Sequence, residues 1–409
     1  MPVNYQAPVA SDLHPVAGVS LGSTNASIRR GDNDDVLLMQ FDARSVAAGV
    51  FTRNRFCAAP VVLCREHLSQ TNGQVRAILV NAGNANAGTG AGGLADARDS
   101  CAAVAQVLGC DAEHVLPMST GVILERLPMD KLLNAVPLAA KLAKADNWLP
   151  AAQAIMTTDT LPKAGCRTAT IDGAAFTMTG IAKGAGMIRP DMGTMLSIVA
   201  TDAAIEPELL QQWVRDAADQ SFNRITVDGD TSTNDSLIVV ATGAGQVRIT
   251  DADSAAALAV RGALFDLTRQ LAQMIIRDGE GATKFITIRV EQAATENEAG
   301  AVAYSIAHSP LVKTAFFASD ANLGRLLCAI GYAGITDLDV DKVELLLGDV
   351  LVASNGGRHP DYQEAAGQLV MAQDEITVTV RLNRGQSATT VWTCDLSHDY
   401  VTINAEYRT

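Results

Sequence analysis

Apolar residues follow two periods along the chain, one typical of strands and one typical of helices. Short apolar runs bounded by Gly, Asn or charged residues predict strands at 75–80, 174–179, 194–201 and 284–290. Apolar residues three and four positions apart predict helices at 94–108, 129–145 and 254–276, with others starting at Pro207 and Pro310. Gly109 is the expected stop of the first of these helices.

Strands and helices are interleaved without a regular strand–helix–strand rhythm. This favours an α+β sandwich over a doubly wound parallel sheet. Near the end of the chain, the turn Asn383-Arg384-Gly385 lies between strand-like segments 376–382 and 389–396. The last polar residues, 404–409, are predicted to follow a strand as a terminal tail.

Composition narrows the class of protein. The 409 residues include 31 Lys+Arg and 45 Asp+Glu, giving a net charge of −14, and 48% are apolar. This apolar content excludes a disordered chain, and the acidic balance argues against nucleic-acid binding. The length suggests two or three domains. No apolar run approaches a bilayer span and no signal peptide is recognisable, so we expect a cytoplasmic protein without a membrane partner.

The cysteines and histidines suggest neither a disulfide framework nor a metal site. There are seven cysteines, an odd number, and none forms a CxxC pair. The six histidines occur singly. Asp228, Asp230 and Asp235 lie in a loop that resembles a calcium loop but lacks its terminal glutamate, so a hydrogen-bonded core loop is the favoured interpretation. We expect a protein free of structural metal.

One glycine-rich segment contains a candidate nucleophile. In KGAGMIRPDMGTML (183–196), Gly193-Thr194 directly precedes a predicted buried strand. An N-terminal threonine can use its own α-amine as a base, and cutting the preceding peptide bond creates such a residue. Glycine leaves the carbonyl that is attacked accessible. A simple glycine turn leading into the strand is the alternative interpretation.

Other segments offer supporting groups. Thr120 and Gly121 follow an apolar stretch, and a Thr-Gly pair in a tight turn can present donors to an oxyanion, although an ordinary turn has the same pattern. Glu280 and Lys284 follow a long predicted helix and can orient a zwitterionic substrate, or simply be solvated there. Residues 88–93 match GxGxxG, but residues 81–87 separate them from the strand, so a structural turn is favoured over a dinucleotide site.

Taken together, these segments resemble the ornithine acetyltransferase (glutamate N-acetyltransferase) family, ArgJ. The resemblance runs nearly end to end and in the family's order. It rests on GVFTRNRFCAAPV (49–61), NAGNANAGTG (81–90), STGVI (119–123), IMTTDTLPK (155–163), KGAGMIRPDMGTML (183–196), ITVDGDTSTNDS (225–236), DGEGATKF (278–285) and INAEYRT (403–409).

The resemblance implies an N-terminal-nucleophile fold, an αββα sandwich of the DmpA/ArgJ type with a smaller C-terminal α/β domain. It further implies self-cleavage between Gly193 and Thr194 into an α chain (1–193) and a β chain (194–409), which assemble as α2β2. Within the β chain, 194–280 would complete the sandwich and 281–409 would form the smaller domain.

The resemblance also implies the roles of individual residues. Thr194 would be the nucleophile, with Thr120 and Gly121 forming the oxyanion hole. The acetyl group of N-acetylornithine would pass through Thr194 to glutamate, releasing ornithine for arginine biosynthesis. The positions that match the family's substrate contacts are Thr157, Lys183, Thr194, Glu280, Asn404 and Thr409.

Two residues depart from the family pattern, and several questions stay open. Gly193 replaces the usual Ala, which bears on the completeness of cleavage, and Leu323 replaces the Trp of NWGR, which bears on local packing. Use of acetyl-CoA as a second donor is open. The alternative functions are a related Thr-nucleophile aminopeptidase or amidase, which hydrolyses its acyl-enzyme, and a dinucleotide-dependent oxidoreductase.

Overall fold

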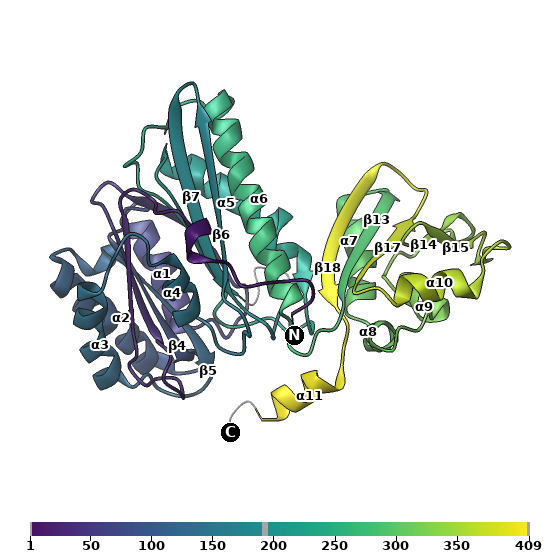
Figure 1. Cartoon of the computed structure of the whole chain (residues 1–409), viewed down its shortest axis with the longest axis horizontal. Helices are drawn as coiled ribbons and strands as arrows, with labels where there is room; N and C mark the ends of the chain where they lie inside the picture. The colour runs from purple at the N-terminus through teal and green to yellow at the C-terminus, as the bar shows by residue number, and fades with distance from the viewer. Residues whose placement is uncertain (1, 190–194, 407–409) are drawn as a thin grey trace. The chain divides into compact units, whose positions relative to one another are not determined.

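The computed structural model describes residues 2–189 and 195–406, and the chain forms two compact units (Figure 1). The larger unit comprises Ala7–Asn223 and Asp230–Ile275. The smaller unit comprises Met1–Gln6, Arg224–Gly229 and Ile276–Thr409. The smaller unit is therefore assembled from three separate stretches of sequence.

Two sheets form the centre of the larger unit. The first has the order β1-β2-β4-β5, in which only the β4–β5 pair is parallel. The second has the order β3-β11-β8-β7-β6, in which only β11–β8 is parallel. The bounds are β1 Val19–Thr24, β2 Val36–Phe41, β4 Ala77–Asn84 and β5 Val115–Val122, then β3 Val46–Phe51, β11 Ser236–Ala241, β8 Leu196–Thr201, β7 Ala174–Lys183 and β6 Lys163–Ile171, with a small pair, β9 Ala204–Ile205 and β12 Arg248–Ile249.

Helices cover the outer faces of both sheets. On the first sheet, Leu38 and Leu79 pack in one buried cluster with Leu63, Val104 and Val136 of three helices. These helices are α1 (Ala59–Gln70), α2 (Gly90–Leu108) and α3 (Met129–Lys141). On the second sheet, α5 (Pro207–Gln220) packs on β3 and β11, and α6 (Ala255–Arg277) packs on β6 and β7.

A second buried cluster joins the inner faces of the two sheets. It brings Leu37 and Ile78 of the first sheet together with Ile181 and Ile198 of the second. Helix α4 (Trp148–Ala154) contributes the fully buried Trp148 to the same cluster. The layers therefore run helix, sheet, sheet, helix, which confirms the αββα sandwich expected from the sequence.

The smaller unit is built on one mixed sheet with the order β10-β18-β13-β17-β14-β15-β16. Its apolar core includes Ile288, Val302 and Val378. The strands are β10 Ile225–Thr226, β13 Phe285–Ala293, β14 Glu344–Leu347, β15 Val350–Ser354, β16 Gly357–Arg358, β17 Glu375–Arg381 and β18 Ser387–Cys394. The helices are α7 Glu296–Ala307, α8 Pro310–Phe317, α9 Leu323–Gly331, α10 Glu364–Met371 and α11 His398–Ala405.

Several element boundaries differ from the expected ones. Strand β4 continues to Asn84, into the Gly/Asn-rich stretch expected to be a loop. Gly109 ends α2 as predicted, with a left-handed φ of 65°. The turn at 383–385 joins β17 and β18, and each of these pairs with β13, which lies between them. Helix α11 was not predicted, because its residues have no apolar periodicity and none of them is buried.

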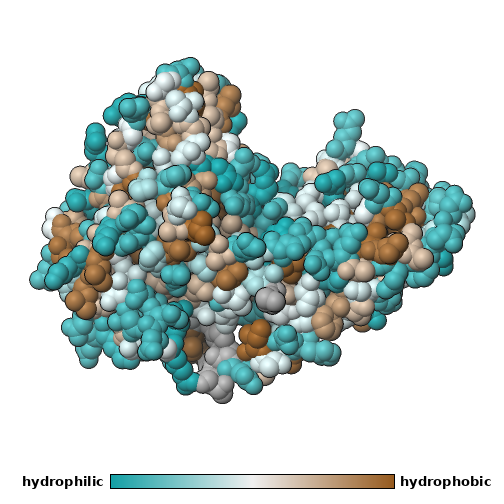
Figure 2. Space-filling view, in the orientation of Figure 1, coloured by the Kyte–Doolittle hydropathy of each residue, from teal (hydrophilic) through white to brown (hydrophobic). Residues whose placement is uncertain are grey.

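The described surface is mainly polar. Figure 2 shows apolar side chains in small separate patches on the visible face. Among the helices of residues 2–189 and 195–406, none has both the length and the apolar character of a membrane span.

Candidate active site

The Thr120-Gly121 pair lies near the end of strand β5 rather than in the tight turn that we expected. Gly121 has a φ of 132°, which side chains rarely allow. It pairs with Gly83 of β4, and a Cβ on Gly121 would lie only 2.2 Å from the carbonyl carbon of Gly83. Close approach of two strands therefore requires glycine at this position.

Buried side-chain amides hold this end of β5. The Ser119 hydroxyl donates to Oδ1 of Asn81 at 2.6 Å, and Nδ2 of Asn81 donates to the carbonyl of Asn84 at 2.8 Å. From the segment that precedes β11, Nδ2 of Asn234 donates to the carbonyl of Ser119 at 2.9 Å. The asparagines of the NAGNANAGTG and TSTNDS segments thus fix the strand that carries the predicted oxyanion hole.

Lys183 connects the two sheets at this point. It is the last residue of β7, and its Nζ donates to Oγ1 of Thr120 at 3.2 Å. Each of the two residues is only 9% exposed. The structure therefore brings together two predicted site residues that are 63 positions apart in the sequence.

A buried carboxylate, Asp159, organises the residues around Lys183. Its Oδ1 accepts from Nζ of Lys163 at 2.7 Å and from the N–H of Gly184 at 2.7 Å. Its Oδ2 accepts from the N–H of Thr157 at 3.0 Å. Asp159 thereby fixes the backbone of one predicted substrate residue, Thr157, and of the residue that follows another, Lys183.

The pKa of Asp159 is set by opposing effects. Burial raises the pKa, but the charges of Lys163 and Lys183 and the N–H of Gly184 lower it further, so that the net value is well below the usual range. Asp159 is therefore ionised at neutral pH. We did not predict Asp159 or Lys163 from the sequence, although an Asp and a Lys four residues apart in a hydroxyl-rich segment are visible in TTDTLPK.

A cavity of about 620 Å³ opens beside this network. Thr157, Asp159 and Thr160 line it together with Arg29 and Arg30. Its size suits a small-molecule ligand, and its lining carries both cationic and anionic groups. It can therefore accommodate a zwitterionic compound.

Two further predicted residues lie in the smaller unit. Nδ2 of Asn404, on α11, donates to Oε2 of Glu280 at 2.7 Å, and Glu280 is 8% exposed. The hydroxyl of Tyr400 on the same helix donates to Asp228 at 3.2 Å. Glu280 and Asn404 thus form one set, and Thr120, Gly121, Thr157 and Lys183 form another within the larger unit.

Gly193, Thr194 and Thr409 lie outside the described residues. The nearest described strand residue is Leu196, two positions after Thr194 in the sequence. Leu196 begins β8 and pairs with Lys183 of β7.

The glycine motif at 88–93 is filled by the chain's own side chains. The Thr89 hydroxyl donates to Oδ1 of Asn86 at 2.8 Å, and Nδ2 of Asn86 donates to the carbonyl of Gly93 at 2.8 Å. A Cβ on Gly93 would lie 1.8 Å from the Thr89 hydroxyl oxygen. Residues 90–93 form the first turn of helix α2 rather than the separate turn that we expected, and these contacts argue against a pyrophosphate site.

The described residues offer little for a metal ion to bind. No group of three or more His, Cys, Asp or Glu side chains there is arranged to hold an ion. In the segment 225–236, Asn234 and Thr231 take part in hydrogen bonds to neighbouring segments.

Comparison with models of known protein families identifies the family of this chain. The ArgJ family model matches residues 20–409. The chain belongs to the ArgJ family. The arginine biosynthesis bifunctional protein ArgJ from Bacillus halodurans is 39% identical, with 50% of this chain and 96% of that chain covered and a TM-score of 0.47.

Two further solved structures are similar to this ArgJ-family chain. Ornithine acetyltransferase from Mycobacterium tuberculosis, solved in complex with ornithine, is 34% identical over 46% of this chain and 98% of that chain, with a TM-score of 0.39. The L-aminopeptidase D-Ala-esterase/amidase from Ochrobactrum anthropi is 12% identical, with coverages of 68% and 90% and a TM-score of 0.37.

The ArgJ-family departure at Leu323 is accommodated locally. Leu323 is the first residue of α9 and packs, partly buried, against the core of the smaller unit. Asn322 caps the helix by accepting from the N–H of Arg325 at 3.2 Å, and Arg325 donates to the carbonyl of Leu311 at 2.7 Å. The helix start is thus intact with Leu at this position.

Proposed function

We propose that this ArgJ-family protein is an ornithine acetyltransferase, which transfers the acetyl group of N-acetylornithine to glutamate and releases ornithine. The observation that carries the proposal is the family match over residues 20–409, which spans all the predicted site residues. The contact between Lys183 and Thr120 and the cavity beside Thr157 add physical support.

Self-cleavage prepares the nucleophile in this proposal. The Thr194 hydroxyl attacks the carbonyl of Gly193, the peptide C–N bond breaks as an ester forms, and water hydrolyses the ester. The products are an α chain, 1–193, and a β chain, 194–409, assembled as α2β2. Within the β chain, the stretch up to Ile275 completes the sandwich, apart from Arg224–Gly229, and Ile276–Thr409 belongs to the smaller unit.

In the first half-reaction, the free α-amine of Thr194 accepts the hydroxyl proton, and Oγ1 bonds to the acetyl carbon. Thr120 and Gly121 stabilise the resulting oxyanion, which lowers the barrier by a few kcal/mol, about 3 per well-placed donor. Oγ1 of Thr120 accepts from Lys183, so its own proton remains available for the oxyanion. The C–N bond then breaks, and the proton passes to the departing amine of ornithine.

In the second half-reaction, the amine of glutamate attacks the acetyl carbon of acetyl-Thr194, the ester C–O bond breaks, and the α-amine of Thr194 passes the proton from the attacking amine to Oγ1. Both substrates share an α-carboxylate, which Lys183 holds in this scheme. Thr157, Glu280, Asn404 and Thr409 contact the remaining polar groups. Protein groups supply every proton transfer, so the scheme contains no cofactor.

The decisive experiment measures the intact mass of the denatured protein together with acetyl transfer. The wild type is expected to give pieces of 193 and 216 residues, the second from 409 − 193. Thr194→Ala is expected to remain a single chain without transfer. Thr170→Ala, an exposed position on β6, is the matched control and should be cleaved normally. An intact wild-type chain with full activity would overturn the proposal.

The dependence of the reaction on glutamate, the acetyl acceptor, distinguishes an acetyltransferase from a hydrolase. Consumption of N-acetylornithine should depend on glutamate, whereas turnover that ignores glutamate would indicate an amidase. The same assay with acetyl-CoA in place of N-acetylornithine determines whether the enzyme accepts a second donor.

A further inference from the structure

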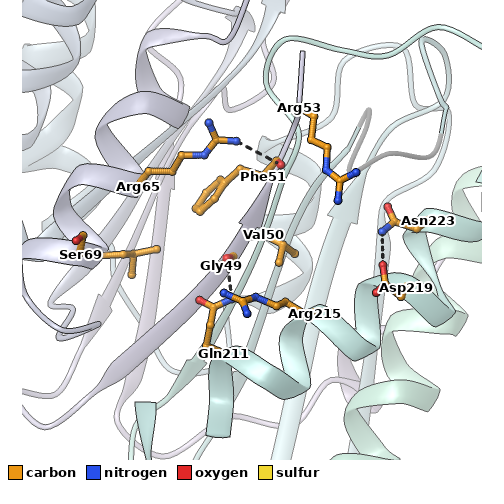
Figure 3. A pocket seen from close by; sticks show the side chains of 11 residues that line it. Gly49, Val50, Phe51, Arg53, Arg65, Ser69, Gln211, Arg215, Asp219 and Asn223 are labelled. Atoms are coloured by element: carbon orange, nitrogen blue, oxygen red, sulfur yellow. Dashed lines mark hydrogen bonds between the residues drawn. The ribbon is translucent and has the colours of Figure 1, made fainter. Parts of the chain in front are cut away.

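A second cavity in the larger unit gathers positive charge on an acidic protein. It has a volume of about 530 Å³ and lies over strand β3, between helices α1 and α5. Among the described residues, Arg53, Arg65 and Arg215 line it, together with one carboxylate, Asp219. Figure 3 shows the three arginines reaching this space from the segment after β3, from α1 and from α5. We call this cavity the arginine groove.

The three guanidinium groups that line the arginine groove favour the binding of an anion there. Like charges repel, and the chain as a whole carries −14, so random surface would place acidic groups here more often. Asp219 already accepts a hydrogen bond from Nδ2 of Asn223 at 2.7 Å. Within the described part of the chain, Arg215 makes no ion pair, and it is exposed. Its guanidinium is thus available to a ligand.

Part of the arginine groove is rigid before any ligand binds. Arg65 donates to the carbonyl of Thr52 at 2.6 Å, and its guanidinium lies 5.8 Å from the centre of the Phe51 ring. Gln211 donates to the carbonyl of Gly49 at 3.2 Å. Arginine anchored in this way loses less entropy on binding and presents its remaining N–H groups in a fixed fork.

The arginine groove is larger than a simple anion requires. Its volume lies in the range of small-molecule sites. A neighbouring cavity of about 370 Å³ shares Leu68, Gln211 and Arg215 with it and continues along β3 to Ala47 and Ala48, where Glu208 of α5 also lines it. The two together can take a ligand with an anionic head at the arginines and an uncharged arm along the strand.

We propose that the arginine groove is a binding site for a phosphate-bearing small molecule, in particular a diphosphate ester with an extended uncharged arm. The planar guanidinium fork matches phosphate oxygens in a bidentate manner, which gives both charge and geometry. The residues of the groove belong to none of the groups assigned to acetyl transfer. The phosphate site is therefore independent of the proposed function. Only the assignment of the site to an acetyl donor rests on the proposed acetyl transfer.

Calorimetry on the full-length protein with inorganic pyrophosphate tests the site. Arg215→Gln is expected to weaken binding about 10- to 100-fold, since a charged hydrogen bond is lost. Arg269→Gln is the control, because Arg269 is a half-exposed arginine on α6 that pairs with Asp266, and it should bind like the wild type. Affinity should also fall as salt is raised. Absent binding, or equal binding by wild type and Arg215→Gln, would overturn the proposal.

Two further arms identify the source of the phosphate, and either positive result supports the site. Tighter binding of coenzyme A than of ADP, with Arg215→Gln slowing acetylation of glutamate by acetyl-CoA but not by N-acetylornithine, assigns the groove to a donor. Tighter binding of ADP, with transfer rates that respond to ADP, assigns it to a nucleotide effector. A changed oligomeric state of Arg215→Gln with unchanged pyrophosphate binding would instead make the groove a subunit contact and overturn the proposal. Pyrophosphate binding without any acetyl transfer would contradict only the proposed function.

Discussion

Both units bury charged side chains, and one example from each shows two different ways of stabilising them. In the smaller unit, the partners are mainly backbone groups and hydroxyls. Nζ of Lys313 donates to Oγ1 of Thr393 at 3.0 Å and to the carbonyl of Cys394, and Asp395 accepts from the N–H groups of Thr283 and Lys284 at 2.8 and 2.9 Å. These bonds tie the start of β13 and helix α8 to the end of β18.

In the larger unit, a buried aspartate and a buried lysine bond to each other. Asp159 and Lys163 have fully buried side chains, and Asp159 also lines the 620 Å³ cavity. Burying two charges is costly, and such a pair is weak evidence for stability on its own. The contrast teaches that buried charge paired with the backbone holds strands together, whereas a buried ion pair beside a cavity is a candidate for organising a substrate.

The largest effect is expected for Lys163→Met, which leaves the Asp159 carboxylate buried without its main cation. Loss of one partner of a buried pair lowers the free energy of unfolding by about 3–5 kcal/mol. Urea unfolding followed by tryptophan fluorescence, with Trp148 in the sandwich core, measures the change. Lys141→Met, at an exposed position of α3, is the control. Equal stability of Lys163→Met and wild type would contradict the prediction that breaking the Asp159–Lys163 ion pair destabilises the larger unit.

A smaller effect is expected for Lys313→Met in the other unit. Its acceptors, Thr393 and Cys394, would lose the buried lysine as a donor, which lowers the unfolding free energy by about 1–3 kcal/mol. Because these groups are structural in our interpretation, kcat and KM of the folded enzyme should not change. A fall in kcat without a loss of stability would break the distinction between the two units.

The smallest effect is expected in the pH dependence of the stability difference between wild type and Asp159→Asn. The pKa of Asp159 is lowered in the folded state, so its contribution to stability is present above the unfolded value of about 3.9 and is lost as the pH falls. The stability difference between wild type and Asp159→Asn should therefore shrink by up to about 1.4 kcal/mol per pH unit below about pH 4. Unfolding curves between pH 3 and pH 7 measure it. A constant difference would show that the pKa is not lowered.

Element types were predictable where the local pattern was strong. Pro207 begins α5 and Gly109 ends α2, because fixed φ and left-handed φ are local properties of these residues. The extension of β4 to Asn84 was not predictable, because it depends on pairing with β5, a partner distant in sequence. Helix α11 was missed for a related reason, since contacts such as Tyr400 to Asp228 replace an apolar face.

The site was predictable by residue type but not by geometry. Thr120 and Lys183 are predicted as site residues from two different segments of the sequence, and only the fold shows that their side chains are in contact. Asp159 was overlooked because an aspartate beside threonines ordinarily indicates a turn. Its role depends on complete burial and on the N–H of Gly184, which is 25 residues away.

The order of the five-stranded sheet determines what a broken chain would do. Strands β8 and β11 are neighbours within this sheet, and they lie between β3 and β7, which both precede them in the sequence. A cut ahead of β8 would remove one covalent bond and leave the β3–β11 and β7–β8 ladders in place. The fragments would then be held by a shared sheet rather than by an interface between separately folded bodies. Dilution could not separate them, and only denaturation would.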